Sequence, residues 1–334
     1  MRLFKGTLAA PLLLALGGCK LVVMDPAGDI AMQQRNLILL ATGLMLLIIV
    51  PVIALTLFFA WKYRASNTQA AYAPDWHHST KLELVIWSIP LAIIMVLGSV
   101  AWVTSHTLDP YRPLDRIAPG RPVAAGVAPL EVDVVALDWK WLFIYPQLGV
   151  ASVNELAAPV DRPIAFRITA SSVMNSFYVP ALAGQVYAMP RMQTQLHAVI
   201  NKAGVYDGLS ANYSGAGFSG MRFKFEGLPQ ADFDRWVAGV RASPARLTRA
   251  DYARLAAPSQ DEPVRHYAAV DPDLFRAIIQ GCAEGQSCAD GMPGMPEMSH
   301  MARAPSGQAP ICSSPQRLGL NARSAPADRA VRAE

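Results

Sequence analysis

The chain contains little cysteine and little histidine. Its 334 residues include four cysteines and six histidines, and no cysteine lies between Cys19 and Cys282. His197 is the only histidine between residues 107 and 265. Proteins that move single electrons through copper use thiolate and imidazole ligands, which suit both oxidation states of the metal. The middle of the chain therefore lacks the side chains that such a centre requires.

Charged residues are also few. They make up 16% of the chain, against 52% hydrophobic residues, and the formal net charge of +4 is spread along the whole length. Nucleic-acid binding requires a concentrated basic region, so this composition argues against a nucleic-acid partner. A chain with so little charge is typical of a membrane-associated protein.

Two long segments contain no charge at all. Residues 37–60 would extend about 36 Å as a helix at 1.5 Å per residue, which is enough to cross a bilayer. Residues 84–103 are likewise uncharged. We predict a membrane protein with a two-helix transmembrane hairpin, made of helices over residues 36–61 and 81–105 joined by a loop at 62–80.

The amino-terminal segment is typical of an exported protein. Two basic residues precede the apolar run Leu12-Leu-Leu-Ala-Leu16, and small residues lead to Cys19. This three-part pattern predicts a signal peptide over residues 1–18. The run Leu-Gly-Gly-Cys resembles a bacterial lipobox, which implies a lipid on Cys19 and an anchored segment over residues 19–35. The alternative is an ordinary signal peptide with a chance cysteine.

An exported amino terminus sets the orientation of the hairpin. With two spans, residues 62–80 form a cytoplasmic loop and the chain beyond the second span returns to the outer side. The basic residues support this orientation only weakly, because they follow the second span as well as occupying the loop. The predicted location is the bacterial inner membrane, with the C-terminal domain on the periplasmic side.

The chain outside the membrane changes character three times. Residues 106–129, rich in Pro, Gly and Ala, are predicted to be a linker. Residues 130–227 contain short runs of alternating apolar and polar residues, which predict an all-β antiparallel sandwich or barrel. Residues 228–280 carry amphipathic patterns that predict short helices, and residues 281–334 have the composition of a disordered tail. The alternating runs are 130–134, 164–168, 195–199 and 221–225, and the helical patterns are 232–240 and 251–255.

The tail has two further features. Four methionines recur at every third position from Met292 to Met301. Thioether ligands suit cuprous copper, but a low-complexity tail explains the repeat equally well. An oxidising compartment would also permit Cys282 to pair with Cys288.

The segment from Val173 to Met221 indicates a function. It reads Val-Met-Asn175-Ser-Phe-Tyr-Val-Pro at its start and Ser210-Ala-Asn-Tyr-Ser214-Gly-Ala-Gly-Phe218-Ser-Gly-Met221 at its end. By residue type alone, Ser, Gly and Asn here would form turns between strands. The arrangement resembles subunit II of the haem-copper respiratory oxidases, and its wording is especially similar to the subunit II family of bacterial cytochrome bo-type ubiquinol oxidases.

In the family members that oxidise cytochrome c, this segment binds a copper pair through two His, two Cys and a Met, with a Glu between the cysteines. The corresponding positions here hold Asn175, Ser210, Asn212, Ser214 and Phe218, and only Met221 is retained. A serine hydroxyl stays protonated and is a hard oxygen donor, so it cannot replace a bridging thiolate. The resemblance therefore implies an exported cupredoxin-like sandwich that binds no metal, with the haems and copper held by subunit I.

A second match lies at the start of the second span. Thr80-Lys-Leu-Glu83-Leu-Val-Ile-Trp87-Ser-Ile-Pro90 resembles the Leu-Glu-x-x-x-Trp-x-x-Pro motif of the same family. Glu83, Trp87 and Pro90 share one helix face, which suits contact with a partner subunit. In the family this Glu lies at the mouth of a proton pathway, so the resemblance makes Glu83 a candidate proton inlet. The residues alone also fit a capping box, in which Glu83 bonds back to the helix start at Thr80.

An aromatic run provides the third match. Asp138-Trp139-Lys-Trp141-Leu-Phe-Ile-Tyr145 resembles the run that lies between bound cytochrome c and copper in the cytochrome c oxidising relatives. Without copper these rings have no electron to relay. We interpret Trp139 and Trp141 as hydrophobic anchors at an interface with membrane-embedded subunits.

Together these matches, over residues 19–280, imply a non-redox subunit II of a proton-pumping quinol:oxygen oxidoreductase. Such a chain is part of an enzyme but has no catalytic centre of its own. Its partners would be subunit I, smaller membrane subunits and the lipid bilayer, with quinol as the substrate of the complex. Two alternatives stay open: a cytochrome c oxidase subunit with a rebuilt copper centre, and a free-standing membrane lipoprotein that binds or assembles other proteins.

Overall fold

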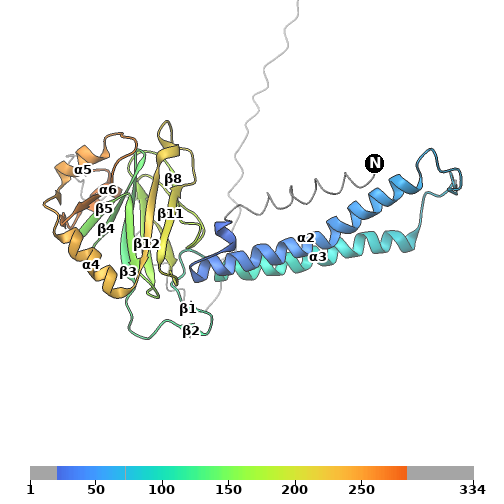
Figure 1. Ribbon diagram of the computed structural model, residues 1–334, viewed down its shortest axis with the longest axis horizontal. Coiled ribbons are helices and arrows are strands. Elements are labelled where there is room, and N and C mark those ends of the chain that lie inside the picture. The colour runs from blue at the N-terminus through green and yellow to red at the C-terminus, as the bar shows by residue number, and fades with distance from the viewer. Residues whose placement is uncertain (1–20, 72, 284–334) are drawn as a thin grey trace, which may run out of the picture. The chain divides into compact units, whose positions relative to one another are not determined.

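Two long helices lead into a β-rich domain in this computed structural model, which describes residues 21–71 and 73–283 (Figure 1). A 3-10 turn, η2 (Val22–Met24), precedes α2 (Asp29–Lys62), and α3 (Thr80–Thr107) follows. The predicted signal peptide, Cys19, Cys288 and the methionine repeat lie outside the described residues.

The two helices are apolar around their circumference and are long enough to cross a membrane. They run antiparallel to each other (Figure 1). Most of their large hydrophobic side chains are exposed, as lipid-facing helices require. Pro51 and Pro90 lie inside the helices without ending them. The two predicted apolar helices are confirmed, and α2 starts earlier than residue 36 because its first turn is bound by the β-rich domain.

Eleven strands build the two main sheets of that domain. Their bounds are β3 (Leu130–Leu137), β4 (Lys140–Tyr145), β5 (Val150–Val153), β6 (Glu155–Pro159), β7 (Ile164–Ala170), β8 (Asn175–Tyr178), β9 (Val186–Ala188), β10 (Thr194–Ala198), β11 (Gly204–Ser210), β12 (Arg222–Leu228) and β14 (Arg265–Tyr267). One sheet has the order β10-β7-β3-β4-β5-β14, and the other has the order β6-β12-β11-β8-β9. The predicted all-β sandwich is confirmed.

The alternating pattern had suggested an antiparallel sandwich, but two strand pairs of the observed sandwich are parallel. β3 pairs with β7 in parallel, and β12 pairs with β6 in parallel. The two strands of each parallel pair are not consecutive in the chain. They are linked by longer crossover connections, because a hairpin joins only antiparallel strands. Alternation reports which face of a strand is buried, but it carries no information about strand direction.

Aromatic rings fill the space between the sheets. Trp141 and Phe143 of β4 meet Phe177 of β8 and Phe223 of β12, and all four are buried. The Phe177 and Phe223 rings stack with centroids 5.5 Å apart, and the Trp141 ring meets Phe177 edge-on at 5.6 Å. Large rings in offset or edge-on contact supply much of the burial energy of such a core.

The segment after β12 is more than a helical extension. It contains α4 (Gln230–Arg241), β13 (Arg246–Leu247), α5 (Arg249–Ala256), β14, β15 (Ala269–Val270) and α6 (Leu274–Gln280). β14 pairs with β5 and adds an edge strand to the first sheet, which the sequence did not predict. α6 was also missed.

This extension covers the outer face of the first sheet with a second hydrophobic core. Val135 and Leu137 of β3 face it, whereas Val134 and Ala136 face the sandwich interior. Successive side chains of a strand point to opposite faces, so β3 is buried on both sides. Tyr252 of α5 and several residues of α6 complete this second core.

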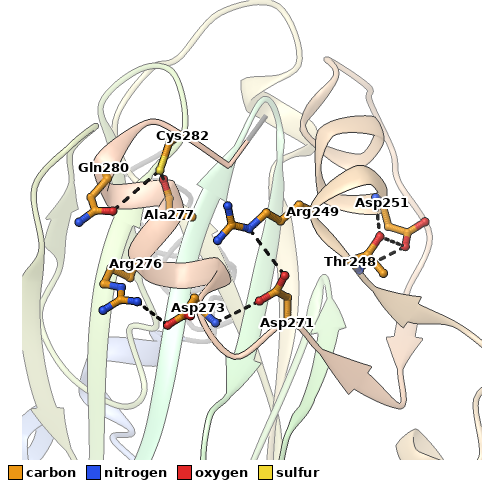
Figure 2. A network of polar contacts seen from close by, with 9 residues as sticks. All are labelled: Thr248, Arg249, Asp251, Asp271, Asp273, Arg276, Ala277, Gln280 and Cys282. Carbon is orange, nitrogen blue, oxygen red and sulfur yellow. Dashed lines mark hydrogen bonds and ion pairs between the residues drawn. The ribbon is translucent and has the colours of Figure 1, made fainter. Parts of the chain in front are cut away.

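Polar contacts tie the helices of the extension together (Figure 2). Thr248 and Asp251 form a capping box at the start of α5, and Arg249 lies 3.6 Å from Asp271, just before α6. Cys282, assigned to the tail by composition, is buried with Ala283 in the second core, and it is disulfide-bonded. A tail beginning at residue 281 is therefore wrong at its first residues.

The start of α2 is inserted into the sandwich. The backbone N–H groups of Ala27 and Gly28 donate to Ala181 O at 2.9 and 3.0 Å, and Asn201 N–H donates to Ala27 O at 2.8 Å. Asp29, almost fully buried, accepts bonds from the Arg116 guanidinium at 3.0 and 3.3 Å. Arg116 belongs to a small hairpin of β1 (Arg116–Ala118) and β2 (Arg121–Pro122) inside the predicted linker.

We expect Gly28→Ala to destabilise the protein. A Cβ at this position would lie 2.5 Å from Val199 O and 2.8 Å from Leu182 O, and both are backbone atoms. The free energy of unfolding should fall by about 1–3 kcal/mol, as for other overpacked sites. Denaturation of the purified chain in detergent, followed by tryptophan fluorescence, measures the change.

The control is Gly239→Ala in α4, where an added Cβ meets nothing within 4 Å. Alanine favours a helix interior over glycine, so this variant should be as stable as wild type or slightly more so. Equal stability of Gly28→Ala and Gly239→Ala would contradict the insertion of α2 into the sandwich.

Candidate functional site

The segment identified from the sequence forms one hydrogen-bonded cluster at the ends of β8 and β11. Ser210 Oγ lies 3.2 Å from Asn175 Oδ1 and 3.2 Å from Asn212 O, and Ser176 N–H donates to Ser210 Oγ at 3.4 Å. Asn175 and Ser210 are both buried. The cluster thus brings together side chains separated by 35 residues in the sequence.

Asn212 joins the two loops of this cluster. Its Nδ2 donates to the carbonyl oxygen of Met174, at 3.1 Å, in the loop that precedes β8. Asn175 Nδ2 donates to Val173 O at 3.1 Å in the same loop. Amide groups that bind backbone oxygens in this way hold a loop closed, so these side chains have a packing role.

The remaining three predicted positions lie outside this cluster, and the buried Ser214 Oγ has no hydrogen-bond partner among the described residues. The Phe218 ring meets Tyr213 edge-on at 5.6 Å, and the Ser214 carbonyl accepts a bond from Trp139 Nε1 at 3.1 Å. Met221 is buried in the sandwich core. Among residues 21–71 and 73–283, no group of three His, Cys, Asp or Glu side chains is placed to hold a metal ion.

Trp139 lies against the glycine-rich part of this segment. A Cβ on Gly217 would come within 2.5 Å of the Trp139 ring, and a Cβ on Gly215 would come within 3.3 Å. Glycine is therefore required at position 217 for the ring to approach the loop. Trp139 itself has a positive φ of 66°, a conformation that is uncommon for a non-glycine residue.

Trp141 has a different environment from the one the sequence suggested. It has no exposed surface, and its ring contacts Phe177 and Phe223 inside the sandwich. A fully buried side chain cannot contact a partner subunit, so Trp141 is a core residue. Trp139 stays half-exposed, because it lies in the turn before β4 with a positive φ and is not part of the strand that carries Trp141 into the core.

Lys140, between the two tryptophans, was not identified from the sequence. Its side chain is buried, and Nζ donates to Ala257 O at 2.8 Å and to Ser259 Oγ at 2.6 Å. Burial lowers the pKa of this ammonium group. Lys140 therefore fixes the loop after α5 beside the segment that carries Gly217. The available signal was a lysine in an otherwise apolar strand.

Glu83 lies in the first turn of α3 with 48% of its side chain exposed. Its Oε1 lies 2.7 Å from His78 Nδ1, and the other ring nitrogen of His78 is 3.2 Å from Thr80 Oγ1. The capping box predicted from the sequence is wrong. The helix begins at Thr80 with Ser79 as its N-cap, and no side-chain cap hydrogen bond forms. A capping box needs its acidic residue three positions after the N-cap, whereas Glu83 lies four positions after it, and the backbone N–H of Glu83 donates to Ser79 O.

Trp87 and Pro90 follow Glu83 on α3. Trp87 is 74% exposed, and Pro90 is half-buried. Their spacing from Glu83 keeps the three on one side of the helix. The structure therefore leaves this face free in the isolated chain and places His78 beside Glu83.

Two family models match the chain. The model described as "Cytochrome C oxidase subunit II, periplasmic domain" matches residues 134–227, and the one described as "COX Aromatic Rich Motif" matches residues 241–286. The first corresponds to the cupredoxin-like sandwich and the second to most of the extension. Fold and sequence thus define a class of protein: a periplasmic domain of the oxidase subunit II type, carried by two membrane helices.

Relatives of known identity place the chain more narrowly. Cytochrome bo(3) ubiquinol oxidase subunit 2 of Pseudomonas putida is 52% identical over 80% of this chain and 82% of its own length. The protein of the same name from Pseudomonas aeruginosa is 52% identical over 81% and 78%, and ubiquinol oxidase subunit 2 of Acetobacter aceti is 48% identical over 82% and 86%. The chain belongs to the family of ubiquinol oxidase subunit 2, which confirms the resemblance seen in the sequence.

We expect Lys140→Met to loosen the loop after α5. Methionine keeps an unbranched apolar side chain but leaves Ala257 O and Ser259 Oγ without their donor. Buried groups that lose a partner cost about 1–3 kcal/mol, so the free energy of unfolding should fall by that amount. Chemical denaturation of the purified chain provides the measurement.

Lys202→Met is the matched control, because Lys202 is 58% exposed and pairs with the exposed Asp25. Exposed pairs contribute little, so this variant should stay within about 0.5 kcal/mol of wild type. An equally small effect of Lys140→Met would show that the buried lysine does not hold the loop.

Proposed function

We propose that this chain is the non-redox second subunit of a proton-pumping quinol:oxygen oxidoreductase in the aerobic respiratory chain of a bacterial inner membrane. Subunit I would hold the haems and the copper that bind oxygen, and this chain would anchor it and cover its periplasmic side. The observation that carries the proposal is the Asn175–Ser210–Asn212 cluster, found where cytochrome c oxidising relatives have copper ligands.

The chemistry of that cluster supports a role without electron transfer. Its groups are neutral amides and hydroxyls that bond to one another and to the backbone. A copper pair needs thiolate bridges and imidazoles to exchange electrons with little rearrangement. A soluble donor would therefore find no electron acceptor in this domain, and electrons would enter the complex from quinol within the membrane.

The purified complex should oxidise ubiquinol and leave reduced cytochrome c unchanged. When this chain is separated from its partners in detergent, metal analysis should find no copper in it, because Ser210 and Ser214 cannot act as thiolates. Copper retained by subunit I in the same preparation is the control against metal loss during separation. One copper per chain, bound by residues 130–226, would contradict the proposal.

We propose in addition that Glu83 takes up protons at the cytoplasmic edge of the membrane. Glu83 and His78 are both about half-exposed and lie within hydrogen-bond distance of each other. Two titratable groups at such a separation can pass a proton between them and to water. Contact of Trp87 and Pro90 with subunit I would place the Glu83 carboxylate at the start of its proton pathway.

Replacing Glu83 by alanine should slow oxygen reduction by the complex about tenfold, the effect of a modest increase in the barrier to proton delivery. Haem reduction by ubiquinol should keep its normal rate, since electrons do not pass through this residue. Stopped-flow absorbance and steady-state oxygen consumption measure the two steps.

Lys81→Ala, which removes a neighbouring charge in the same helical turn, is the control and should keep normal turnover. Full turnover with normal haem kinetics in Glu83→Ala would remove the proton-inlet role. A loss of both haem reduction and turnover would point to a defect in assembly, which the haem content of the purified complex measures separately.

The remaining contacts with the membrane follow from the same proposal. Trp139, Trp87 and Pro90 would lie at interfaces with subunit I and smaller membrane subunits, since aromatic side chains are enriched at protein interfaces. A lipid on Cys19, such as palmitate, would be a supplementary anchor on the periplasmic side. Acyl chains bind a bilayer far more weakly than spanning helices do.

A further inference from the structure

The last described residues of the chain, Cys282 and Ala283, are buried. Each has only 3% of its surface exposed, and both belong to the second hydrophobic core, which α6 shares with the outer face of β3. Of the four cysteines, only Cys282 lies among residues 21–71 and 73–283, and it is disulfide-bonded. The cysteine bonded to it therefore lies outside the described residues. A covalent bond at this place joins another part of the chain to the second core.

The end of α6 directs Cys282 into this core (Figure 2). Gly281 has a positive φ of 72°, and its N–H donates to Ile278 O at 3.0 Å. Cys282 N–H donates to Ala277 O at 2.9 Å. These two bonds form a Schellman motif, which turns the chain back at a helix end. Cys282 Sγ then lies 3.5 Å from Ala277 O, against the last turn of the helix.

α6 is too short to be stable by itself. It has seven residues, whereas isolated helices shorter than about 12–15 residues are marginal in water. Four of its side chains, Leu274, Phe275, Ala277 and Ile278, are buried in the second core. The helix therefore depends on keeping this face packed against the sheet. A covalent bond directly after the helix would oppose its release.

The sequence offers three possible partners for Cys282, namely Cys19, Cys288 and Cys312. Cys288 follows Cys282 by six residues, with Gly285 between them, whereas Cys312 follows by thirty. Closing a shorter loop costs less chain entropy. A lipid on Cys19, expected from the lipobox-like sequence, would occupy the sulfur of that residue. The cost of loop closure and the available sulfurs therefore both favour Cys288.

We propose that Cys282 and Cys288 form an intramolecular disulfide that holds α6 on the outer face of β3, and that reduction of this bond loosens the helix. The bond forms by exchange with an oxidised protein disulfide of the periplasm. One cysteine thiolate attacks that disulfide and releases a thiolate. The second attacks the resulting mixed disulfide, forms the Cys282–Cys288 bond and releases the other thiolate. The two cysteine thiols thus lose two electrons and two protons, and the oxidant becomes a dithiol.

The bond acts mainly on the opened state of this segment. When α6 detaches from the sheet, a closed loop just after it has fewer conformations than an open chain, so opening becomes less favourable. The reduced Cys282 would still be a small apolar side chain that fits the same core. Reduction should therefore increase local opening of α6 and leave the sandwich intact.

The first test maps the bond in the full-length protein purified from the membrane in detergent. Free thiols are alkylated under denaturing conditions without a reductant, and the chain is digested with trypsin. The peptide of residues 277–303 contains both Cys282 and Cys288, and Cys312 lies in the peptide of residues 304–317. The first peptide should be unalkylated and two hydrogen atoms lighter than its dithiol form. Alkylation of both cysteines, or a bond from Cys282 to another peptide, would overturn the inference.

The second test measures hydrogen–deuterium exchange of α6 by mass spectrometry. In Cys288→Ser, the amides of α6 should exchange about tenfold faster than in wild type, because local opening is no longer restricted. Wild type treated with tris(2-carboxyethyl)phosphine should show the same increase. Cys312→Ser is the matched control and should exchange as wild type does, and α4 should be unchanged in every sample.

Unchanged exchange of α6 in both Cys288→Ser and reduced wild type would overturn the role of the bond, even if the bond itself is mapped. If Cys288→Ser is not recovered from the membrane, the reduced wild-type protein carries the comparison. The inference depends on the periplasmic location of the domain and not on quinol oxidation. Neither test measures oxidase activity, so failure of the proposed function leaves their outcomes unaffected.

Discussion

The buried ion pair between Asp29 and Arg116 connects the membrane helices to the outer domain. Asp29 is in the first turn of α2 and has almost no contact with water, while Arg116 comes from the hairpin after α3. Removing one partner of such a pair leaves a buried charge, which costs about 3–5 kcal/mol. The helix start, the linker hairpin and the sandwich are therefore held together as one unit. Gly28 permits this arrangement, because the sandwich backbone leaves no space for a side chain there.

The outer domain is held together by the packing of its interior and by hydrogen bonds within its loops. Its interior is filled by rings such as Trp141, Phe177 and Phe223, which pack against one another across the two sheets. At the loop end of the sandwich, Asn175 and Ser210 satisfy each other's hydrogen-bonding groups. Buried polar groups are tolerated when they are paired. Asn175, Ser210 and Asn212 thus bond to one another and to the backbone, while the buried Ser214 Oγ has no hydrogen-bond partner among the described residues.

The two ends of the helical hairpin carry different charged groups. At one end, Glu83 and His78 form an exposed titratable pair, suited to exchanging protons with water. At the other end, the buried carboxylate of Asp29 is paired with Arg116 and with Gln33.

The sequence by itself determined the two apolar helices, the all-β domain and the family, because uncharged length, period-two alternation and the residues at positions 175 to 221 are local properties of the chain. It could not give strand direction, the added strand β14 or the burial of Cys282, since these depend on which segments meet in space. It also assigned Trp139 and Trp141 the same role, although Trp141 lies in β4 within the core, whereas Trp139 lies in the turn before β4 and is half-exposed. The partners of Lys140 and Asp29 were decided only by the tertiary structure. A hydrogen bond or ion pair requires two groups within about 3 Å of each other, and between distant segments only folding creates that proximity.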